Sequence, residues 1–521
     1  MTLANYLREN RYAEARRDGG FHMMTYVIQE LWYDSNDANA IPRDRLLQFP
    51  AFWQYYSTVS REKSHVYVAN QFANLIRIAL TAEHVLPQRI YKLNANVHSA
   101  TLSHAQCAAL VARMFFRGQK MSTNFREILQ GTSRLHVEKL RFLFAYFDRI
   151  AEDCPDGCVS FRLVEAREKS FPEIWQSRKT AKPGDVRIYS DMLIEETNLC
   201  TQVDFANKRL GGGVLNRGSV QEEIRFLMCP EMFVGMLLAP KTGMDDQQAI
   251  SIVGARVYSS YQGYAKSLQW RPLTCRHARQ NDPALRDEYG RCRVETIAID
   301  ATQFDTEDVR EQVGGATQSR EIKKATIGFA AQGANFERIP IVTGFWGCGA
   351  FQGHKPLKFL QQVLAAGIAN RPLVFCTFGD VEMAKMLEEL LKKIREADME
   401  LVSMNQMMRA AALWMNQPPW RAHCRDDRVL LKFWSTYIQN PERFDQGPQS
   451  PGPPPRVPAP TLRSQTVDPW TVIVVEPSIR LRPTSTNSIS LARIGSFSYV
   501  TPWAKTNITT MWFPKIADLG L

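Results

Sequence analysis

The chain has 521 residues, which is more than one ordinary domain needs and enough to bury a large hydrophobic core. Hydrophobic residues make up 45% and charged residues 22%, a balance typical of globular proteins, and no apolar run approaches the roughly 18 residues that span a bilayer. The 64 Lys and Arg residues outnumber the 53 Asp and Glu residues, and the resulting net charge of +11 suits a polyanionic partner without identifying which one.

The first part of the chain shows mainly helical periodicity. Apolar residues recur at three- and four-residue spacing, with charged residues between them, in residues 107–116 and 137–152. We therefore predict that residues 1–180 form an N-terminal helical region.

Short strands and helices alternate from about residue 181 to residue 400. Segments that are rich in β-branched or aromatic residues and bounded by turn residues are predicted to be strands: 186–196, 201–206, 249–259, 294–302 and 371–378. Helical patterns accompany several of these strands, at 224–229, 355–368 and 380–397. This alternation predicts an α/β domain in residues 181–440, with helices that sandwich a mixed or parallel sheet, and such sheets bind ligands at the carboxyl ends of their strands.

The composition changes after residue 440. Residues 447–460 read GPQSPGPPPRVPAP, with seven prolines in fourteen residues, which predicts an extended linker over residues 441–460. The tail at 461–521 has strand-like pieces, such as residues 471–475, separated by Ser, Thr and Pro. A small β appendage and a disordered tail are both consistent with this pattern.

Three consecutive glycines, residues 211–213, follow a predicted strand and precede a predicted helix. Glycine lets the backbone approach a ligand closely and present N–H groups to a phosphate, although an ordinary turn is the commoner explanation. Ser219 and Glu222 match the capping box S-x-x-E, in which the glutamate bonds back to the serine N–H. Adjacent helical residues point about 100° apart, so this cap leaves Glu223 free to face a ligand held by the glycines.

A second loop, TGFWGCGAFQG in residues 343–353, also follows an apolar segment and precedes a helix. Its four glycines predict a cradle for a diphosphate opposite the first loop. The alternative is a tight turn whose Trp346 and Phe351 anchor the core. Two such loops in one α/β domain are better evidence for a site than either loop alone.

Aromatic residues cluster after the predicted strand at 249–259. Tyr258, Tyr261 and Tyr264 either pack against the fold or present a face that stacks on a base or ribose, and their spacing alone favours packing.

The ten cysteines are scattered, and no charged start is followed by a long apolar run, so we expect a reduced intracellular protein without a secretory signal. The segments with Cys154 and Cys158, and with Cys275 and His277, lack the paired spacing of a structural zinc site. We therefore expect no metal, and a Cys–His nucleophilic pair stays open without positive support.

Three glycines, seven further residues and then Gln221, Glu222 and Glu223 resemble the signature of poly(ADP-ribose) glycohydrolases. The segments IEE, QVDFAN, YQGYA, GFWGCGAF and FTFGD match the family in order and approximate spacing. The resemblance covers about residues 185–400 well, extends more loosely into the N-terminal region, and excludes the linker and tail. It implies a macrodomain-like catalytic core behind an accessory helical region, and cleavage of the ribose–ribose O-glycosidic bond of poly(ADP-ribose).

The resemblance also implies residue roles. Asp204, Glu222 and Glu223 match the acidic active-site residues of the family. We hypothesise that Glu223 protonates the leaving ribose oxygen as an oxocarbenium-like centre forms and then deprotonates the attacking water. Glu222 would orient ribose hydroxyls, and Asp204 and Asn207 would fix the loop and bind ribose.

The positions implied to contact substrate come from both loops and their surroundings. Residues 345–351 resemble the diphosphate-binding loop, Tyr264 the tyrosine near the ADP-ribose, and Phe378 the phenylalanine that stacks near adenine. Vertebrate members have an asparagine where this chain has Phe345, so a polar side-chain contact is not expected there. The full set is Ile194, Glu195, Asn207, Gly211, Gly212, Gly213, Gln221, Tyr264, Phe345, Trp346, Gly347, Cys348, Gly349, Ala350, Phe351 and Phe378.

The expected partner is poly(ADP-ribose) attached to modified proteins, with no cofactor and no membrane. Direct nucleic-acid binding is not expected to be primary, because a basic surface serves a polymer with two phosphates per unit equally well. We expect a monomer located in the nucleus, with the cytoplasm as the second candidate. The alternative function is a non-catalytic reader of ADP-ribose polymers, which the presence of all three acidic positions disfavours.

Overall fold

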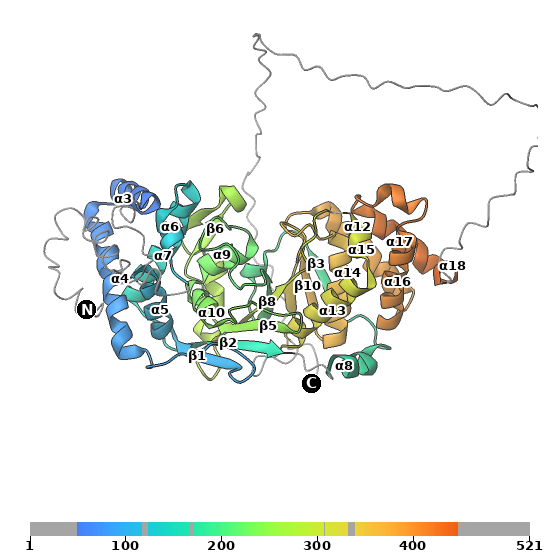
Figure 1. Ribbon diagram of the computed structural model, residues 1–521, viewed down its shortest axis with the longest axis horizontal. Helices are drawn as coiled ribbons and strands as arrows, with labels where there is room; N and C mark the ends of the chain where they lie inside the picture. The colour runs from blue at the N-terminus through green and yellow to red at the C-terminus, as the bar shows by residue number, and fades with distance from the viewer. Residues whose placement is uncertain (1–48, 117–122, 166–169, 307, 332–338, 446–521) are drawn as a thin grey trace, which may run out of the picture. The chain divides into compact units, whose positions relative to one another are not determined.

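The computed structural model describes residues 49–116, 123–165, 170–306, 308–331 and 339–445, without the side chains of residues 170–172 (Figure 1). All of these belong to one contact unit, Met1–Gly452. A short helix, α18 (Glu442–Asp445), occupies the start of the predicted linker. The rest of that linker and the whole tail at 461–521 lie outside the described residues.

An eight-stranded sheet forms the centre of the described residues. Its strands, in spatial order, are β1 (Ser99–Ser103), β2 (Cys158–Glu165), β5 (Gln248–Gly254), β8 (Cys292–Asp300), β4 (Cys200–Ala206), β9 (Ile341–Thr343), β10 (Leu373–Cys376) and β3 (Val186–Tyr189). The five strands from β8 to β3 are parallel to one another, whereas β1, β2 and β5 pair antiparallel, and β5 is also antiparallel to β8. The mixed α/β sheet that the sequence predicts is therefore confirmed.

Strands β1 and β2 come from the region predicted to be helical. They extend the sheet beyond β5, so the first 180 residues contribute two strands of the central sheet as well as helices. A separate two-stranded hairpin is formed by β6 (Ser260–Gln262) and β7 (Gln269–Arg271).

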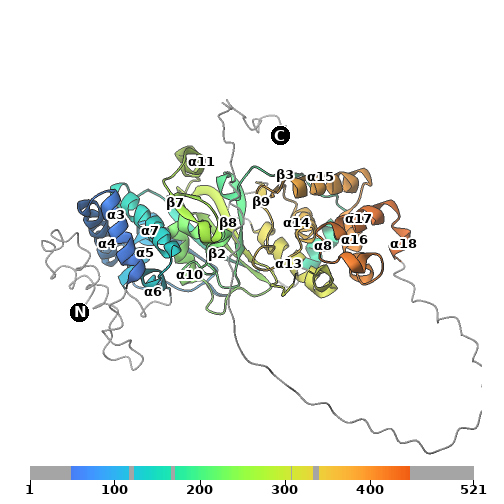
Figure 2. The ribbon, with the colours of Figure 1, turned by 90° about the horizontal axis from the view of Figure 1, so that it is seen from above.

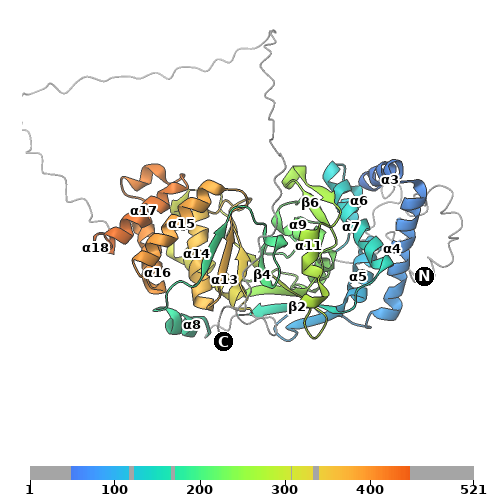
Figure 3. The ribbon, with the colours of Figure 1, turned by 180° about the vertical axis from the view of Figure 1, so that it is seen from behind.

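Helices cover both faces of the sheet (Figures 1 and 2). The helical region at one end holds α3 (Pro50–Glu62), α4 (His65–Val85), α5 (His104–Phe116), α6 (Arg126–Gln130) and α7 (Arg134–Glu152). Shorter helices near the middle are α9 (Gln221–Met228), α10 (Phe233–Leu238) and α11 (Cys275–Ala278), whereas the short helix α12 (Val309–Gln312) lies at the other end. The other end holds α8 (Ser170–Arg178), α13 (Gly315–Ala330), α14 (Lys355–Ala369), α15 (Val381–Glu396), α16 (Leu401–Trp414) and α17 (Arg428–Gln439), and Figure 3 shows the same arrangement from behind. In the described ranges, no helix combines the length and hydropathy that a membrane crossing requires.

The sheet separates two hydrophobic cores because successive strand residues face opposite sides. In β8, Ile297 and Ile299 pack into the core with α13 and α14, whereas Ala298 packs into the core with α5, α9 and α10. In β4, Val203 joins the α13–α14 core, so the next residue, Asp204, faces the side on which α9 lies. The alternation of side chains along β4 therefore directs Asp204 toward the two glutamates of α9.

Helix α7 is the central helix of the N-terminal helical region. Apolar residues at helical spacing, including Leu140, Phe144 and Phe147, are fully buried. The ring of Phe144 lies 4.7 Å from that of Tyr55 on α3 and 5.6 Å from that of Phe72 on α4, measured between centroids. This packing fixes α7 against its neighbours and makes it a rigid support for the loops that it touches.

Candidate active site

The carboxylate of Glu222 is held by two backbone N–H groups. The N–H of Gly211 donates to its Oε1 at 2.6 Å, and the N–H of Asn207 donates to its Oε2 at 2.9 Å. Asn207 directly follows strand β4, so this carboxylate joins the strand end, the glycine loop and the start of α9. The side chain is buried, and its orientation is fixed from two sides.

The carboxylate of Glu223 is held in the same manner one residue later. The N–H of Gly213 donates to its Oε1 at 2.8 Å, and the N–H of Val220 donates to its Oε2 at 2.9 Å. The prediction that Glu223 is left free while Glu222 caps the helix with Ser219 is therefore wrong. Helix α9 begins one residue later, at Gln221, and it is Glu223 that bonds back to the residue before the helix.

The side chain of Gln221 explains this later start. Its Oε1 accepts from the N–H of Phe205 at 2.9 Å, and its Nε2 donates to the carbonyl of Val203 at 3.1 Å. The amide thus pairs with the backbone of β4 in the way that the backbone of a neighbouring strand pairs with it. Its backbone N–H donates to the hydroxyl of Tyr264 at 3.2 Å. Gln221 thus ties the first turn of α9 to strand β4 and to the loop with Tyr264.

The N–H groups of the glycine loop face protein atoms, where the sequence predicts a phosphate. Two of them bind the glutamates, and that of Gly212 donates to the carbonyl of Arg209 at 3.1 Å. Gly212 has a φ of 49°, and a Cβ there would lie 2.5 Å from Glu222 Oε2 and 2.6 Å from Glu223 Oε1. The triple glycine therefore lets the backbone pass close to both carboxylates.

Asp204 completes a cluster of three buried carboxyl groups. Neither of its carboxyl oxygens has a hydrogen-bond partner in the described part of the chain. Burial, together with repulsion from Glu223 and against the attraction of Arg225, raises the pKa of Asp204 to about 8. Burial and repulsion from Asp204 also raise the pKa of Glu222 well above its usual range. Asp204 and Glu222 therefore keep their protons to a higher pH than exposed carboxyl groups do.

Two cavities adjoin the carboxyl cluster. The cavity on the glutamate side has a volume of about 320 Å³ and is lined by both glutamates, the strand end, the glycine loop and the second loop: Phe205, Ala206, Asn207, Gly212, Gly213, Val220, Gln221, Glu222, Glu223, Tyr264, Ala301, Trp346, Gly347, Gly349, Ala350 and Phe351. The second cavity has a volume of about 520 Å³ and is lined mainly by apolar and aromatic residues, among them Ile194, Phe345, Cys348 and Phe378. Phe205, Gln221, Tyr264 and Gly349 line both, so the two cavities are neighbours.

The second glycine-containing loop lies across from the first, after strand β9. The indole of Trp346 is buried and donates its Nε1–H to the carbonyl of Ile299 at 2.9 Å. Lys358 Nζ lies 4.3 Å from the centre of that ring and pairs with the buried carboxylate of Glu321. The interpretation of Trp346 as a core anchor is confirmed, and Phe351 is half-buried, packs against the same core and also lines the smaller cavity.

Aromatic rings line the larger cavity. Phe378 is 56% exposed, and its ring centroid lies 5.2 Å from that of Tyr264. Phe345 packs edge-on against Phe375, with centroids 5.4 Å apart, and receives the ammonium of Lys355 at 5.2 Å. Phe345 therefore contributes an apolar wall to this cavity.

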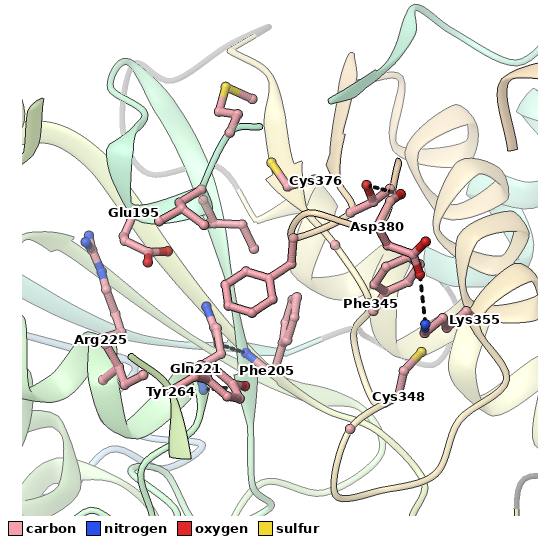
Figure 4. Close-up of a pocket in the computed structure, with 18 of the residues that line it drawn as sticks. Glu195, Phe205, Gln221, Arg225, Tyr264, Phe345, Cys348, Lys355, Cys376 and Asp380 are labelled. Carbon is pink, nitrogen blue, oxygen red and sulfur yellow. Dashed lines mark hydrogen bonds and ion pairs between the residues drawn. The ribbon is translucent and has the colours of Figure 1, made fainter. Parts of the chain in front are cut away.

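Arg225, Lys355 and Asp380 line the larger cavity although the sequence did not mark them as site residues, whereas Glu195 was predicted (Figure 4). Arg225 and Glu195 lie on one side, and the ion pair between Lys355 and Asp380, with a distance of 3.0 Å, lies on the other. Arg225 follows Glu222 by three positions, so a helix places it near the glutamates, but only the strand order brings Glu195 beside it. Burial raises the pKa of Glu195, and this effect outweighs the hydrogen bond from Tyr261, which lowers it.

The three tyrosines have different surroundings. Tyr258 is buried and donates to Glu231 at 2.5 Å, in agreement with packing. Tyr261 donates to Glu195, and Tyr264 faces both cavities. Tyr261 also lines the larger cavity, and Tyr264 lines both cavities, where a ligand ring could stack on it.

The histidine and cysteine candidates lie outside the carboxyl cluster. His277 Nδ1 is 2.8 Å from Thr274 Oγ1 and 3.0 Å from Ser260 Oγ, and Cys275 is exposed. None of the ten cysteines forms a disulfide. Within the described ranges, no group of three or more His, Cys, Asp and Glu side chains is arranged to hold a metal ion.

Comparison with known proteins identifies both parts of the fold. Residues 59–162 match the family model of the helical domain of poly(ADP-ribose) glycohydrolase, and residues 172–385 match the model of its macro domain fold. The chain is 46% identical over 443 residues to poly(ADP-ribose) glycohydrolase 1 of Caenorhabditis elegans, an alignment that covers 84% of this chain and 54% of that protein.

Two further relatives carry the same name. Poly(ADP-ribose) glycohydrolase 2 of Caenorhabditis elegans is 46% identical over 389 residues, which cover 74% of this chain and 78% of that protein. Poly(ADP-ribose) glycohydrolase 1 of Arabidopsis thaliana is 31% identical, with 52% of this chain and 59% of that protein covered. This chain thus spans only about half the length of the first worm relative. The chain belongs to the poly(ADP-ribose) glycohydrolase family.

Proposed function

We propose that this protein hydrolyses the ribose–ribose O-glycosidic bonds of poly(ADP-ribose) and releases ADP-ribose. The observation that carries the proposal is the cluster of Asp204, Glu222 and Glu223 beside a two-part cavity. Glycosidic cleavage requires a carboxyl group that delivers a proton and a carboxylate that takes one back. Burial raises the pKa of Asp204 and of Glu222, which supports a protonated carboxyl group within this cluster.

Glu223 is our proposed general acid and then general base. It protonates the leaving ribose oxygen while positive charge develops at the anomeric carbon, and its carboxylate then takes a proton from the attacking water. A carboxylate has about four lone-pair positions, and backbone N–H groups occupy two of those on Glu223. The side chain is therefore fixed in orientation and can still reach a substrate atom.

The other two carboxyl groups have supporting roles in this proposal. Glu222 also uses two lone-pair positions for backbone N–H groups and keeps others for ribose hydroxyls. Asp204 is fully buried, so it acts on the charge of the two glutamates rather than on the substrate. The larger cavity, with Phe378 and Tyr264, accepts the adenine end of an ADP-ribose unit.

The test compares Glu223→Gln with Glu222→Gln. Both changes replace one acceptor by an NH₂ group that faces a backbone N–H, so both variants carry the same kind of structural cost. Loss of the proton donor in Glu223→Gln should lower turnover by about 10²- to 10⁴-fold while ADP-ribose still binds. Glu222→Gln should mainly weaken substrate binding.

The measurements are release of ADP-ribose from labelled polymer, calorimetric binding of ADP-ribose and thermal unfolding. Near-normal turnover in Glu223→Gln would overturn the assignment of the acid. A wild-type protein that binds polymer and releases no ADP-ribose would identify a non-catalytic reader instead.

A further inference from the structure

Lys139, on helix α7 of the helical region, has a fully buried side chain that ends against the segment after the triple glycine. Its ammonium donates to the carbonyl oxygens of Val214 and Asn216, at 2.8 Å each, and lies 3.5 Å from that of Gly213. An ammonium has three N–H donors and no acceptor, so three carbonyl groups match its hydrogen-bonding capacity. The helical region thus holds the glycine loop from the side away from the cavities.

One residue connects this contact to the carboxyl cluster. Gly213 meets Lys139 through its carbonyl and binds Glu223 through its N–H, at 2.8 Å. The same carbonyl accepts from the N–H of Gly218 at 2.8 Å, which closes the loop. Burial lowers the pKa of Lys139 to about 7, and the charge of Glu223 opposes that lowering, so the two charges interact.

The preceding residue of α7, Glu138, holds another wall of the site. Glu138 accepts from the backbone N–H of Trp270 at 2.8 Å. Trp270 lies in β7, and the turn between β6 and β7 carries Tyr264. Figures 1 and 2 show α7 beside this hairpin. Two successive side chains of one helix therefore reach two different walls.

We propose that Lys139 is a positioning residue for the hydrolysis, which places Glu223 through the backbone of the glycine loop. The inference rests on the proposed function for the identity of the reaction. Lys139 lines neither cavity of the site, so it acts on the placement of the acid and not on substrate affinity. Glu138 acts on the hairpin with Tyr264 and therefore on substrate affinity.

The experiment separates kcat from KM in Lys139→Met and Glu138→Ala. Lys139→Met keeps an unbranched apolar side chain that is one atom shorter and removes all three donors, so kcat should fall by about 10²-fold with little change in KM or in ADP-ribose binding. Glu138→Ala should raise KM and keep most of kcat. Lys139→Gln retains two N–H donors and should give an intermediate kcat, and it replaces the methionine variant if that variant does not fold.

Lys92 provides the matched control. Its ammonium also donates to backbone carbonyls, those of Leu237 at 2.9 Å and Ala239 at 3.2 Å, but these lie at the C-terminal end of helix α10 and not in the glycine loop. Lys92→Met should lower the unfolding temperature and leave kcat unchanged. An unchanged kcat in folded Lys139→Met, or an equal loss of kcat in Lys92→Met, would overturn the inference. Absence of turnover in the wild-type protein would contradict the proposed function instead.

Discussion

Asp204 keeps its proton in the folded protein at pH values where an exposed aspartate has lost it. Its pKa is about 8 in the folded state against 3.8 for the free side chain. A raised pKa means that the folded state binds more protons than the unfolded state between these values. The stabilisation from this group is therefore complete below about pH 4 and is lost as the pH rises through 8. The slope for one full proton is about 1.4 kcal/mol per pH unit.

Asp204→Asn should remove much of this slope. The free energy of unfolding of the wild-type protein, measured by denaturant titration from pH 4 to pH 8, should fall relative to that of the variant. The comparison cancels the opposite contribution of Lys139, whose lowered pKa makes stability rise with pH above 7 in both proteins. Parallel curves for the two proteins would show that Asp204 does not hold the proton.

Single residues of the site were predictable where a motif marks them. Glu222, Glu223 and Tyr264 line one cavity, and Asp204 is buried beside the two glutamates. The cap assignment failed because S-x-x-E is a local pattern, whereas the bond of Gln221 to strand β4 decides where α9 begins. The sequence did not predict a role for Lys139. A lysine on an amphipathic helix is ordinarily taken to face solvent, and its contacts with the loop carbonyls follow only from the tertiary structure.

The glycine loop functions as one element with the first turn of α9. Gly212→Ala would place a methyl group against both glutamate carboxylates and force an alanine into a left-handed conformation, which costs about 1 kcal/mol by itself. Turnover should fall at least about 10-fold because both carboxylates must move. Gly315→Ala, at the start of α13 with open space around the site of its Cβ, should leave turnover unchanged. Steady-state kinetics on the two variants decides this.

Most elements of the α/β part follow from their periodicity. Helix α15 buries Met383, Leu387, Leu390 and Ile394 at helical spacing, and Asp380 caps it by accepting from the N–H of Met383 at 3.0 Å. Strand β1, with the sequence SATLS, has too few apolar residues to be recognised and is a strand because β2 pairs with it.

At the scale of the whole molecule, the sheet crosses the boundary between the two family regions. A fragment from residue 172 to residue 445 lacks β1 and β2, and it would expose the edge of β5 along its whole pairing with β2. Such a fragment should aggregate, whereas a fragment of residues 49–445 keeps all eight strands and should stay soluble. Size-exclusion chromatography and far-UV circular dichroism of both would test this; a soluble, folded shorter fragment would contradict it.

The order of strands could not be obtained from sequence. Alternating strands and helices indicate parallel pairing, but β5 is antiparallel to both of its neighbours, β2 and β8. The amino-acid composition of β5 does not reveal this direction. The larger cavity depends on this order, because Ile194, Gln221 and Phe378 come together only when β4, β9, β10 and β3 stand side by side.

The seven residues between the glycines and Gln221 set the distance and orientation between the glycine loop and helix α9. The chain leaves Gly213, turns through Asn216 and Gly218, whose N–H groups both donate to the Gly213 carbonyl, and returns with Glu223 opposite the Gly213 N–H. One residue added or removed would turn α9 by about 100° and carry both carboxylates away from their donors. The motif is thus a fixed length of chain as much as a set of residue types, and its spacing should tolerate substitution far better than insertion.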